Sequence, residues 1–362
     1  MAKYGFAMRN TSATFRNRQG DGEDMAQTPT GALATRLTAL LGIERPILCG
    51  GLMWLATAEY VAAVVNGGAM GFITPRSYPD TAAFADAVRR CRAMTGGRPF
   101  GVNLYISARE SENARLFEWI GVIEAEGVAC VETAGHSPAG ILPRLKAAGC
   151  KVVHKATTLR HAVKAAEAGA DAVVLIGSEA GGHPGMGDIP AMLLAARAVE
   201  RLDLPVVVGG GIGAGHQLAA ALALGAEGVL VGSRMLVADE IWAHPALKRH
   251  LLTLDEGCST TVLRSLGNTY RCLDNATAAE VARLEGAGVR DYATLGPLVG
   301  GAAQKAAYES GDWSHGILSL GPAAAWCDRL EPAAAILARL EGDALAALGR
   351  IGRPATGLRA TG

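Results

Sequence analysis

Short apolar runs alternate with longer amphipathic segments from about residue 38 onward. The apolar runs are rich in Val, Ile and Leu, as expected for buried strands, whereas the Ala-rich segments between them repeat apolar residues at helical spacing and end in Gly. This alternation is typical of a parallel sheet built from strand–helix units. We expect strands at 46–50, 70–73, 100–104, 129–133, 151–155, 172–177, 205–210 and 228–233.

The number of expected strands decides the architecture. Eight strand–helix units close into a barrel, whereas an open doubly wound sheet more often ends at about five to seven strands. We therefore predict an α/β protein with a (β/α)8 TIM barrel over residues 31–250. The pattern after residue 234 is helical without a further strong strand signal, so residues 251–362 are expected to form a helical substrate or lid subdomain that covers the barrel mouth. Residues 1–30 are expected to be a disordered leader, since they lack the apolar core and cleavage site of a signal peptide.

Composition excludes several classes of partner. The 34 Lys and Arg residues balance 34 Asp and Glu residues, so no nucleic-acid partner is expected. No run approaches the roughly 18 apolar residues of a transmembrane helix, so no membrane partner is expected either. The seven cysteines are scattered and never spaced as C-x-x-C, which argues against disulfides and a metal site and for reduced thiols in the cytoplasm.

Glycines follow the last two expected strands, in GGGIGAG at 209–215 and GSR at 232–234. Loops at these two places are the common phosphate site of a TIM barrel, and Gly lets backbone N–H groups approach the phosphate closely. A plain tight turn and a Rossmann loop remain open, although the Rossmann loop lacks the acidic residue that should end the next strand. We favour a mononucleotide phosphate bound at these two loops.

The loop after the sixth expected strand, SEAGGHPG at 178–185, presents one imidazole. Catalytic groups of TIM barrels lie at this end of the strands, which makes His183 the first catalytic candidate. The glycines before it, including Gly182, would permit close approach of a flat ligand. The alternative is an ordinary loop histidine that bonds a neighbouring carbonyl.

Three further positions at the ends of strands could hold a flat heterocycle. Lys155 ends the fifth strand, where an inward cation needs an anionic partner, although a surface or ion-paired lysine has the same pattern. Asn103 ends the third strand and offers both a donor and an acceptor, as would a satisfied core amide. After the first strand, Gly51, Leu52 and Met53 could pack beside the ring or form only an apolar turn.

These segments together resemble a known family. PILCGGLMW, RPFGVNL, VETAG, VVHKATTLRHAVKAAEAGADAVV, GSEAGGHPG, PVVVGGGIGAGHQLAAALALGAEGVLVGSR and RSLGNTYRCLDN look like the nitronate monooxygenase (2-nitropropane dioxygenase) family of FMN-dependent TIM barrels. The resemblance implies FMN as the cofactor, with Gly51, Leu52, Asn103 and Lys155 around the ring. It also implies phosphate contacts at Gly210, Gly211, Gly232 and Ser233. His183 is then implied as the active-site acid or base.

The functional expectation follows the branch that is most similar. VETAG, VVHK and the DIP after GHPG resemble the NADH:quinone reductase branch, so NADH or NADPH is the expected co-substrate and a small molecule the expected partner of a possible homodimer. Cys49 and Met53 stand where that branch usually has Gln, and 73–80 replaces its nicotinamide-gating loop. A nitronate monooxygenase, an enoyl-thioester reductase with Arg234, Arg264 and Arg271 at the thioester's phosphates, and a non-catalytic flavin-binding protein therefore stay open.

Overall fold

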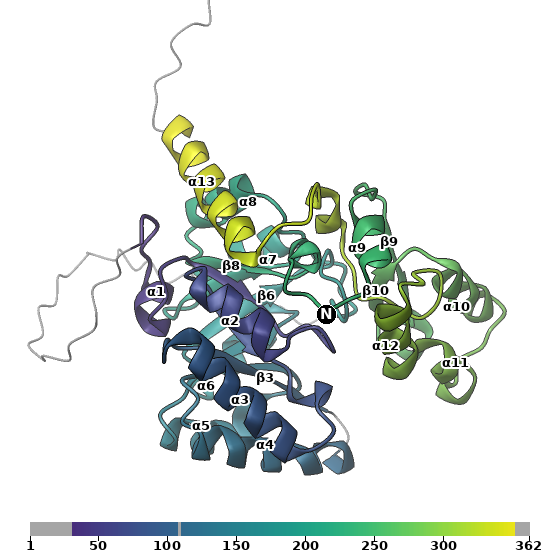
Figure 1. Cartoon of the computed structure of the whole chain (residues 1–362), viewed down its shortest axis with the longest axis horizontal. Coiled ribbons are helices and arrows are strands. Elements are labelled where there is room, and N and C mark those ends of the chain that lie inside the picture. The colour runs from purple at the N-terminus through teal and green to yellow at the C-terminus, as the bar shows by residue number, and fades with distance from the viewer. Residues whose placement is uncertain (1–30, 108–109, 352–362) are drawn as a thin grey trace, which may run out of the picture.

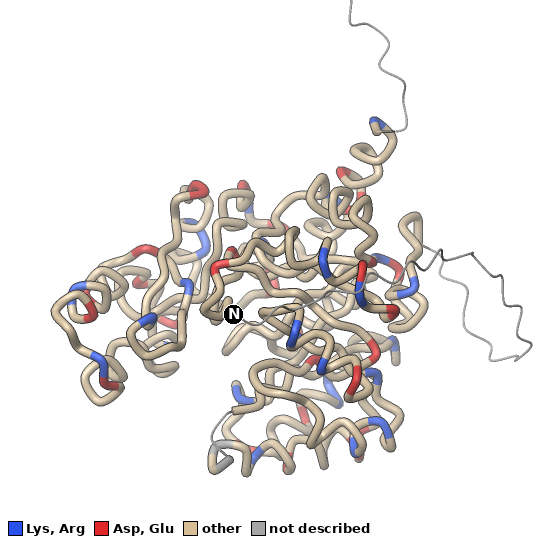
Figure 2. Tube along the Cα trace, turned by 180° about the vertical axis from the view of Figure 1, so that it is seen from behind, with Lys and Arg blue, Asp and Glu red and all other residues tan. Residues whose placement is uncertain are grey.

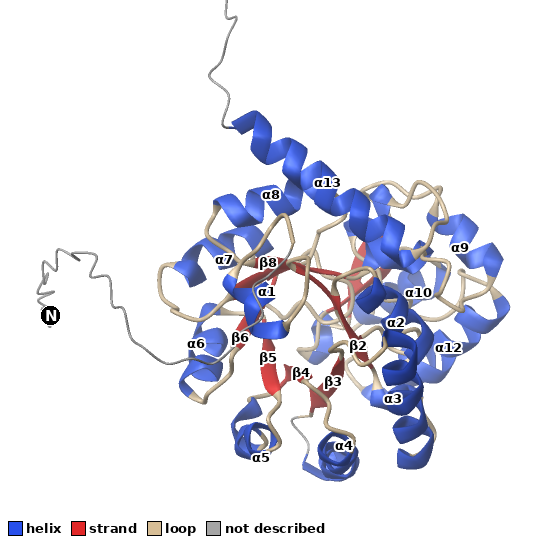
Figure 3. Cartoon of the chain, turned by 60° about the vertical axis from the view of Figure 1, so that its left-hand side comes forward, coloured by secondary structure: helices blue, strands red, loops and turns tan. Residues whose placement is uncertain are grey.

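Eight parallel strands close into a barrel, each hydrogen-bonded to its neighbours in the chain and the last to the first. The computed structural model describes residues 31–107 and 110–351, and the leader expected at 1–30 lies outside them. Figure 3 shows the strands at the centre with helices around them. The strands are β1 (Ile47–Cys49), β2 (Met70–Ile73), β3 (Gly101–Ile106), β4 (Cys130–Gly135), β5 (Lys151–Ala156), β6 (Ala172–Ile176), β7 (Val206–Gly209) and β8 (Gly228–Val231). The predicted TIM barrel is confirmed.

Alternation along each strand separates the barrel interior from the helix layer. Leu48, Phe72, Cys130, Val153 and Val207 belong to one buried apolar cluster inside the barrel, which follows from the two-residue period of a strand. Their neighbours in sequence pack outward against the helices in a second and larger cluster. The outer layer consists of α2 (Ala58–Asn66), α3 (Thr81–Thr95), α4 (Ala114–Ala125), α5 (Leu142–Ala147), α6 (Leu159–Glu167), α7 (Ala191–Val199), α8 (Gly215–Ala223) and α13 (Ala333–Ile351). The short helix α1 (Arg36–Leu41) precedes β1 and closes the opposite end of the barrel through Leu37.

The segment between β8 and α13 forms a separate lobe beside the barrel, shown in green in Figure 1. It has its own apolar core, which includes Val262, Cys272, Val281 and Leu295. The lobe contains α9 (Pro245–Leu251), β9 (Ser259–Val262), β10 (Tyr270–Leu273), α10 (Ala276–Gly286), α11 (Tyr292–Val299) and α12 (Gly301–Ser310). Short 3-10 turns are η1 (Pro75–Ser77), η2 (Glu110–Asn113), η3 (Pro138–Gly140), η4 (Ser233–Val237), η5 (Arg264–Leu266) and η6 (Pro322–Trp326).

Two features of this region differ from the helical pattern expected after residue 250. β9 and β10 form an antiparallel pair, which the sequence pattern missed because strands of four residues carry too few alternations to stand out. Helix α13 packs against α8 and α2 and completes the outer ring, so this part of 251–362 belongs to the barrel and not to its cover. The lobe itself is an insertion between β8, the last strand of the barrel, and α13, its last helix.

The outer helices carry mixed charges, and the cysteines are buried. Figure 2 shows Lys and Arg close to Asp and Glu along the outer helices, as in the pair of Arg144 Nε with Glu124 Oε1 at 2.6 Å. All seven cysteines lie in the part of the chain that the structure describes, and each is a buried free thiol. Within the same ranges, no helix has the length and apolar character needed to cross a bilayer.

Candidate active site

The residues singled out in the sequence gather at one end of the barrel. Because the strands are parallel and adjacent, their C-terminal ends meet at the same mouth. Residues 51–53 follow β1, Asn103 lies in β3, and Lys155 is the penultimate residue of β5. The remaining residues belong to the loops after β6, β7 and β8: Gly182, His183, Gly210, Gly211, Gly232 and Ser233.

A carboxylate that the sequence analysis did not single out lies at the centre of this end. Glu132 follows inward-facing Cys130 by two residues on β4, so its side chain also faces inward, and it is fully buried. Three donors converge on its Oε2: Asn103 Nδ2 at 2.5 Å, Lys155 Nζ at 3.0 Å and the backbone N–H of Gly51 at 3.2 Å. Asn103 and Lys155 are thus held as a pair by one acid, and Lys155 adopts the ion-paired alternative that the sequence left open.

The second oxygen of Glu132 makes this cluster unusual. Oε1 is buried and has no hydrogen-bond partner among the described residues, and a Cβ added to Gly50 would lie 3.3 Å from it. A buried carboxylate oxygen without a donor costs free energy, so it marks a position where a ligand could supply one. Thr74 Oγ1, which also has no described partner, would lie 2.8 Å from a Cβ added to Gly51, so this mouth holds a second unsatisfied polar atom.

The loops after β7 and β8 form an open backbone cradle. Gly210 and Gly211 have φ of +109° and +72°, values that L-residues with a Cβ rarely adopt. A Cβ added to Gly232 would meet nothing nearer than Leu52 Cδ2 at 4.0 Å, so space lies directly above this backbone. The Ser233 hydroxyl accepts a hydrogen bond from the Gly321 N–H at 2.9 Å, which ties the cradle to the segment after the lobe.

The His183 loop is fastened to the lobe by main-chain hydrogen bonds. Gly182 and Arg271 of β10 form an antiparallel bridge, in which the Gly182 N–H donates to the Arg271 carbonyl at 2.9 Å and the Arg271 N–H returns one at 2.7 Å. Glu179 accepts from the Ala191 N–H at the start of α7, at 3.1 and 3.3 Å. The imidazole is therefore carried on a segment held at both the barrel and the lobe.

The His183 ring itself reaches solvent at the mouth. It stands edge-on to the Tyr270 ring, with centroids 4.7 Å apart and an interplanar angle of 87°. Asn268 Nδ2 lies 3.3 Å from His183 Nε2, and because an amide nitrogen donates, this contact is assigned to a neutral ring in which Nε2 accepts and Nδ1 carries the proton. Surrounding protein atoms replace water around the ring and lower the pKa of His183 below 6.5, which favours the neutral imidazole at neutral pH. Asn268 and Tyr270 were not predicted as site residues, although both lie in the RSLGNTYRCLDN segment.

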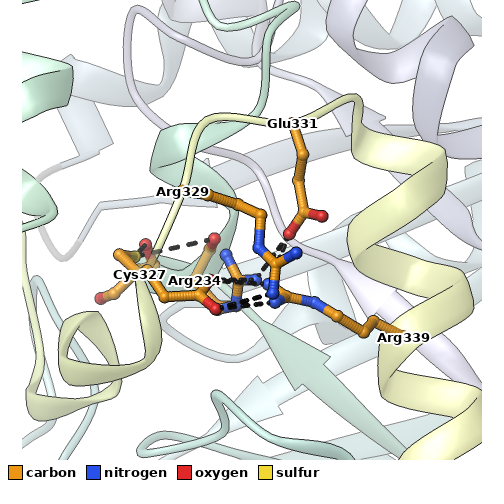
Figure 4. Close-up of polar contacts among 7 residues, drawn as sticks. Arg234, Cys327, Arg329, Glu331 and Arg339 are labelled. Atoms are coloured by element: carbon orange, nitrogen blue, oxygen red, sulfur yellow. Dashed lines mark hydrogen bonds and ion pairs between the residues drawn. The ribbon is translucent and has the colours of Figure 1, made fainter.

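Each of the three arginines that could meet thioester phosphates has a partner within the protein. Arg234 is buried and pairs with Glu331 at 2.9 Å in the cluster shown in Figure 4, where Arg339 contacts the same acid. Arg264 forms a bidentate ion pair with Asp188, with N–O distances of 2.8 and 2.9 Å. Arg271 donates to the Ser178 carbonyl at 2.7 Å. Their role in the described structure is to fix η4, the His183 loop and the lobe.

The buried histidine of β5 faces the other way. His154 Nδ1 lies 2.9 Å from Thr133 Oγ1, on the side of the sheet that packs against the helices. Burial is the largest cause that lowers the pKa of His154 to about 4, followed by the charges of His161 and Lys155. This imidazole is a neutral core group and not part of the mouth.

A TIM barrel whose mouth combines a glycine cradle with an acid–lysine–amide cluster and an imidazole belongs to a class built to hold a cofactor and a small substrate. The family model described as nitronate monooxygenase matches residues 34–343. The chain belongs to the nitronate monooxygenase family, and the resemblance stated from the sequence is confirmed.

Individual relatives carry several activities in their names. A Rhodococcus jostii protein named (3aS,4S,5R,7aS)-5-hydroxy-7a-methyl-1-oxo-octahydro-1H-indene-4-carboxyl-CoA dehydrogenase is 32% identical over 242 residues, which are 67% of this chain and 66% of that protein. The alignment thus spans slightly less than two thirds of that relative. A probable nitronate monooxygenase of Staphylococcus aureus is 28% identical over 316 residues, 76% of this chain and 88% of the relative.

Solved structures agree on the fold over most of the chain. FabK from Thermotoga maritima superposes with a TM-score of 0.79 at 28% identity, covering 88% of this chain and 97% of that one. A nitroalkane oxidase from Streptomyces ansochromogenes gives a TM-score of 0.70 at 26% identity, covering 88% and 100%. The chain is therefore an oxidoreductase of this family, and the choice of substrate has to be argued from its own site.

Proposed function

We propose that this protein is an FMN-dependent oxidoreductase that passes electrons from NADH or NADPH to a small-molecule acceptor, in the manner of an NAD(P)H:quinone reductase. The observation that carries the proposal is the combination, in one mouth, of an open glycine cradle and an imidazole held in its neutral form. The cradle suits a phosphate, and the imidazole suits hydrogen bonding to a reacting oxygen or carbon acid.

The residues present fit FMN. The backbone at Gly210 and Gly211 already has the left-handed φ values of a glycine turn, and the backbone of Gly232 has open space beside it, which suits close approach of a phosphate. Lys155 and Asn103 are 3.0 and 2.5 Å from Glu132, so a cation and an amide edge reach the mouth as one unit with an unsatisfied carboxylate oxygen beside them. When bound, FMN would supply the acceptance and release of an electron pair.

The protein's own groups then position the acceptor. In the tautomer assigned above, the Nδ1–H of His183 is a donor at the mouth, where it could bind an acceptor oxygen while Asn268 occupies Nε2. The Tyr270 ring packs edge-on against the His183 imidazole and fixes the orientation of that imidazole. The Tyr270 hydroxyl is itself hydrogen-bonded to Ser319. The alternative reaction on a nitroalkane requires a base, and a neutral His183 could accept the proton at Nε2 once Asn268 releases that nitrogen.

A second candidate rests on the relatives. The name of the Rhodococcus protein specifies a coenzyme A thioester. An acyl thioester is therefore the alternative acceptor or donor, and an alkyl nitronate is the alternative suggested by the Staphylococcus relative. A flavin-binding protein without turnover is the non-catalytic alternative.

Anaerobic mixing tests the proposal. The FMN-loaded protein is mixed in separate stopped-flow runs with NADH, NADPH and propyl-2-nitronate, while the visible flavin absorbance is followed. Rapid bleaching by a nicotinamide, reversed by a simple quinone, is the expected result. Bleaching by the nitronate alone assigns a nitronate monooxygenase, and reoxidation by an enoyl-CoA but not by quinone assigns the thioester reaction. Absence of bleaching with every reagent overturns the oxidoreductase proposal for these substrates.

A further inference from the structure

Two arginines beside the mouth share an aromatic platform. Arg76 lies in η1, directly after β2, and its guanidinium carbon is 5.3 Å from the centroid of the Tyr105 ring and 5.8 Å from that of Trp119. The guanidinium carbon of Arg115 is 5.3 Å from the same Trp119 ring. Trp119 is almost fully buried on α4, whereas Tyr105 is 40% exposed, so the platform is anchored in the core and opens toward solvent.

Neither cation is neutralised within the described residues. Arg76 forms no ion pair and no hydrogen bond there, and its Nε is a buried donor without a partner. Arg115 donates only to the Pro79 carbonyl, at 3.0 Å. Trp119 Nε1 is another buried donor without a partner. Arg234 and Arg339 differ in this respect, since each forms an ion pair with Glu331.

The position of this pair relates it to the mouth. Tyr105 follows Asn103 by two residues on β3, so both side chains leave the same face of the strand about 7 Å apart. Asn103 belongs to the Glu132 cluster. The arginines therefore lie at the rim of the mouth, beside the strand that carries Asn103.

Stacking prepares a guanidinium for anion binding. A cation–π contact holds the planar group flat against the ring, which leaves its N–H edges directed sideways and reduces the entropy lost on binding. The fork of N–H donors matches phosphate oxygens, and neither fork meets a competing carboxylate within the described residues. A carboxylate ligand would carry half the charge, and an uncharged quinone would leave both cations unused.

We propose that Arg76 and Arg115 form a subsite for the phosphate monoester of an adenosine nucleotide co-substrate. This group occurs as the 2′-phosphate of NADPH and as the 3′-phosphate of coenzyme A. The inference rests on the proposed function, because it assigns the anchor of a molecule that reacts at the neighbouring mouth. It commits the site to the phosphate and leaves the source of the phosphate to the experiment.

Paired ligands that differ only in this phosphate provide the test. Dissociation constants of the FMN-loaded protein are measured by calorimetry for NADPH against NADH and for coenzyme A against 3′-dephospho-coenzyme A. In one of the two pairs the phosphorylated member is expected to bind about 10–100-fold more tightly, as for hydrogen bonds to a charged group. A preference in the first pair identifies the nicotinamide nucleotide, and one in the second pair identifies the thioester handle.

Substitutions locate the effect. Arg76→Met and, separately, Arg115→Met are expected to reduce that preference by about tenfold or more, while Arg76→Lys retains part of it because the charge remains without the fork. Arg197→Met is the matched control, since it removes one positive charge from the end of α7, where Arg197 pairs with Glu200 at 2.7 Å. Should Arg76→Met fold poorly, Arg115→Met and Arg76→Lys still carry the test.

Equal affinity within both pairs, or a preference that survives both methionine substitutions, overturns the phosphate subsite. Such a result is distinct from failure of the proposed function, which is judged by bleaching of the flavin in the anaerobic experiment. A protein that is reduced by a nicotinamide nucleotide but shows equal affinity within both ligand pairs would keep its function and lose this subsite.

Discussion

The pairing of Lys155 with Glu132 predicts an ordered set of stability losses. Glu132 is fully buried, whereas the Lys155 side chain keeps 18% of its exposure, and their charged atoms are 3.0 Å apart. At an effective dielectric constant of about 20, two unit charges at that distance attract by roughly 5–6 kcal/mol before desolvation is subtracted. Removal of one partner of a buried pair typically costs about 3–5 kcal/mol.

The two partners are not equivalent. Glu132→Gln leaves a cation that water can partly reach, so we expect a loss of about 2–3 kcal/mol in the free energy of unfolding. Lys155→Met leaves a carboxylate that water cannot reach and that keeps only Asn103 and Gly51 as donors, so we expect about 3–5 kcal/mol. The double variant should lose less than the sum by at least about 1 kcal/mol, because neither charge is then left alone.

Urea unfolding at one fixed FMN concentration measures these losses, since a ligand of the folded state adds to apparent stability. Arg197→Met is the matched control: Arg197 and its partner Glu200 are both more than half exposed, and the expected loss is below about 1 kcal/mol. Strictly additive effects in the double variant, or a smaller loss for Lys155→Met than for Glu132→Gln, would refute the account of this cluster.

Three further predictions concern the mouth and the core. His183→Ala should retain bound FMN but lower turnover by roughly 10²–10⁴-fold, with the wild-type rate declining below the lowered pKa of His183; retention of full turnover would remove its proposed role. His154 has a pKa of about 4 in the folded protein against 6.5 when exposed, so the unfolded state binds more protons between these two values, and the free energy of unfolding falls by about 3 kcal/mol as the pH drops through this window. His154→Asn should flatten this pH dependence in urea titrations at pH 4 to 7. An unchanged slope would contradict the assignment of His154 as a neutral core group. Gly51→Ala places a Cβ 2.5 Å from the Asn103 Cβ, so it should cost about 1–3 kcal/mol and weaken FMN binding in a fluorescence titration, whereas Gly342→Ala, with nothing within 4 Å, should do neither; equal behaviour of the two variants would show that the mouth is not tightly packed.

The strands and the barrel could be predicted because each strand can be recognised from its own local sequence. A run such as AVVLIG is buried on both faces and bounded by turn residues, so its position follows from local sequence to within a residue or two of β6. Eight such runs then imply closure, and closure implies that the mouth lies at the C-terminal ends. The location of His183 and of the glycine loops followed from this rule alone.

Glu132 could not be found in this way because its role depends on strand register. Asn103 stands directly opposite Glu132 in the pairing of β3 with β4, and Lys155 comes from β5 on the other side. Register across parallel strands is set by the packing of the whole barrel, and a single Glu in VETAG carries no local sign of it. The motif VETAG indicated the family but did not identify the carboxylate.

The packing of the residues after 250 was predicted least well for a similar reason. The amphipathic pattern of residues 333–351 predicts a helix but does not indicate the surface on which this helix packs. The contacts of α13 with α8 and α2 join residues far apart in the chain, which a local pattern does not show. The bridge between Gly182 and Arg271, which fixes the His183 loop, is another long-range contact between short segments. Site residues on β10 and in the adjoining turn therefore emerged only from the structure.

The most direct test of the central claim is a crystal structure of the protein with flavin bound. The account predicts FMN at the C-terminal end of the barrel, with its phosphate on the backbone of Gly210, Gly211, Gly232 and Ser233, and its ring between the Lys155–Asn103 pair and His183. A flavin phosphate located elsewhere, or a ring out of contact with His183, would contradict it.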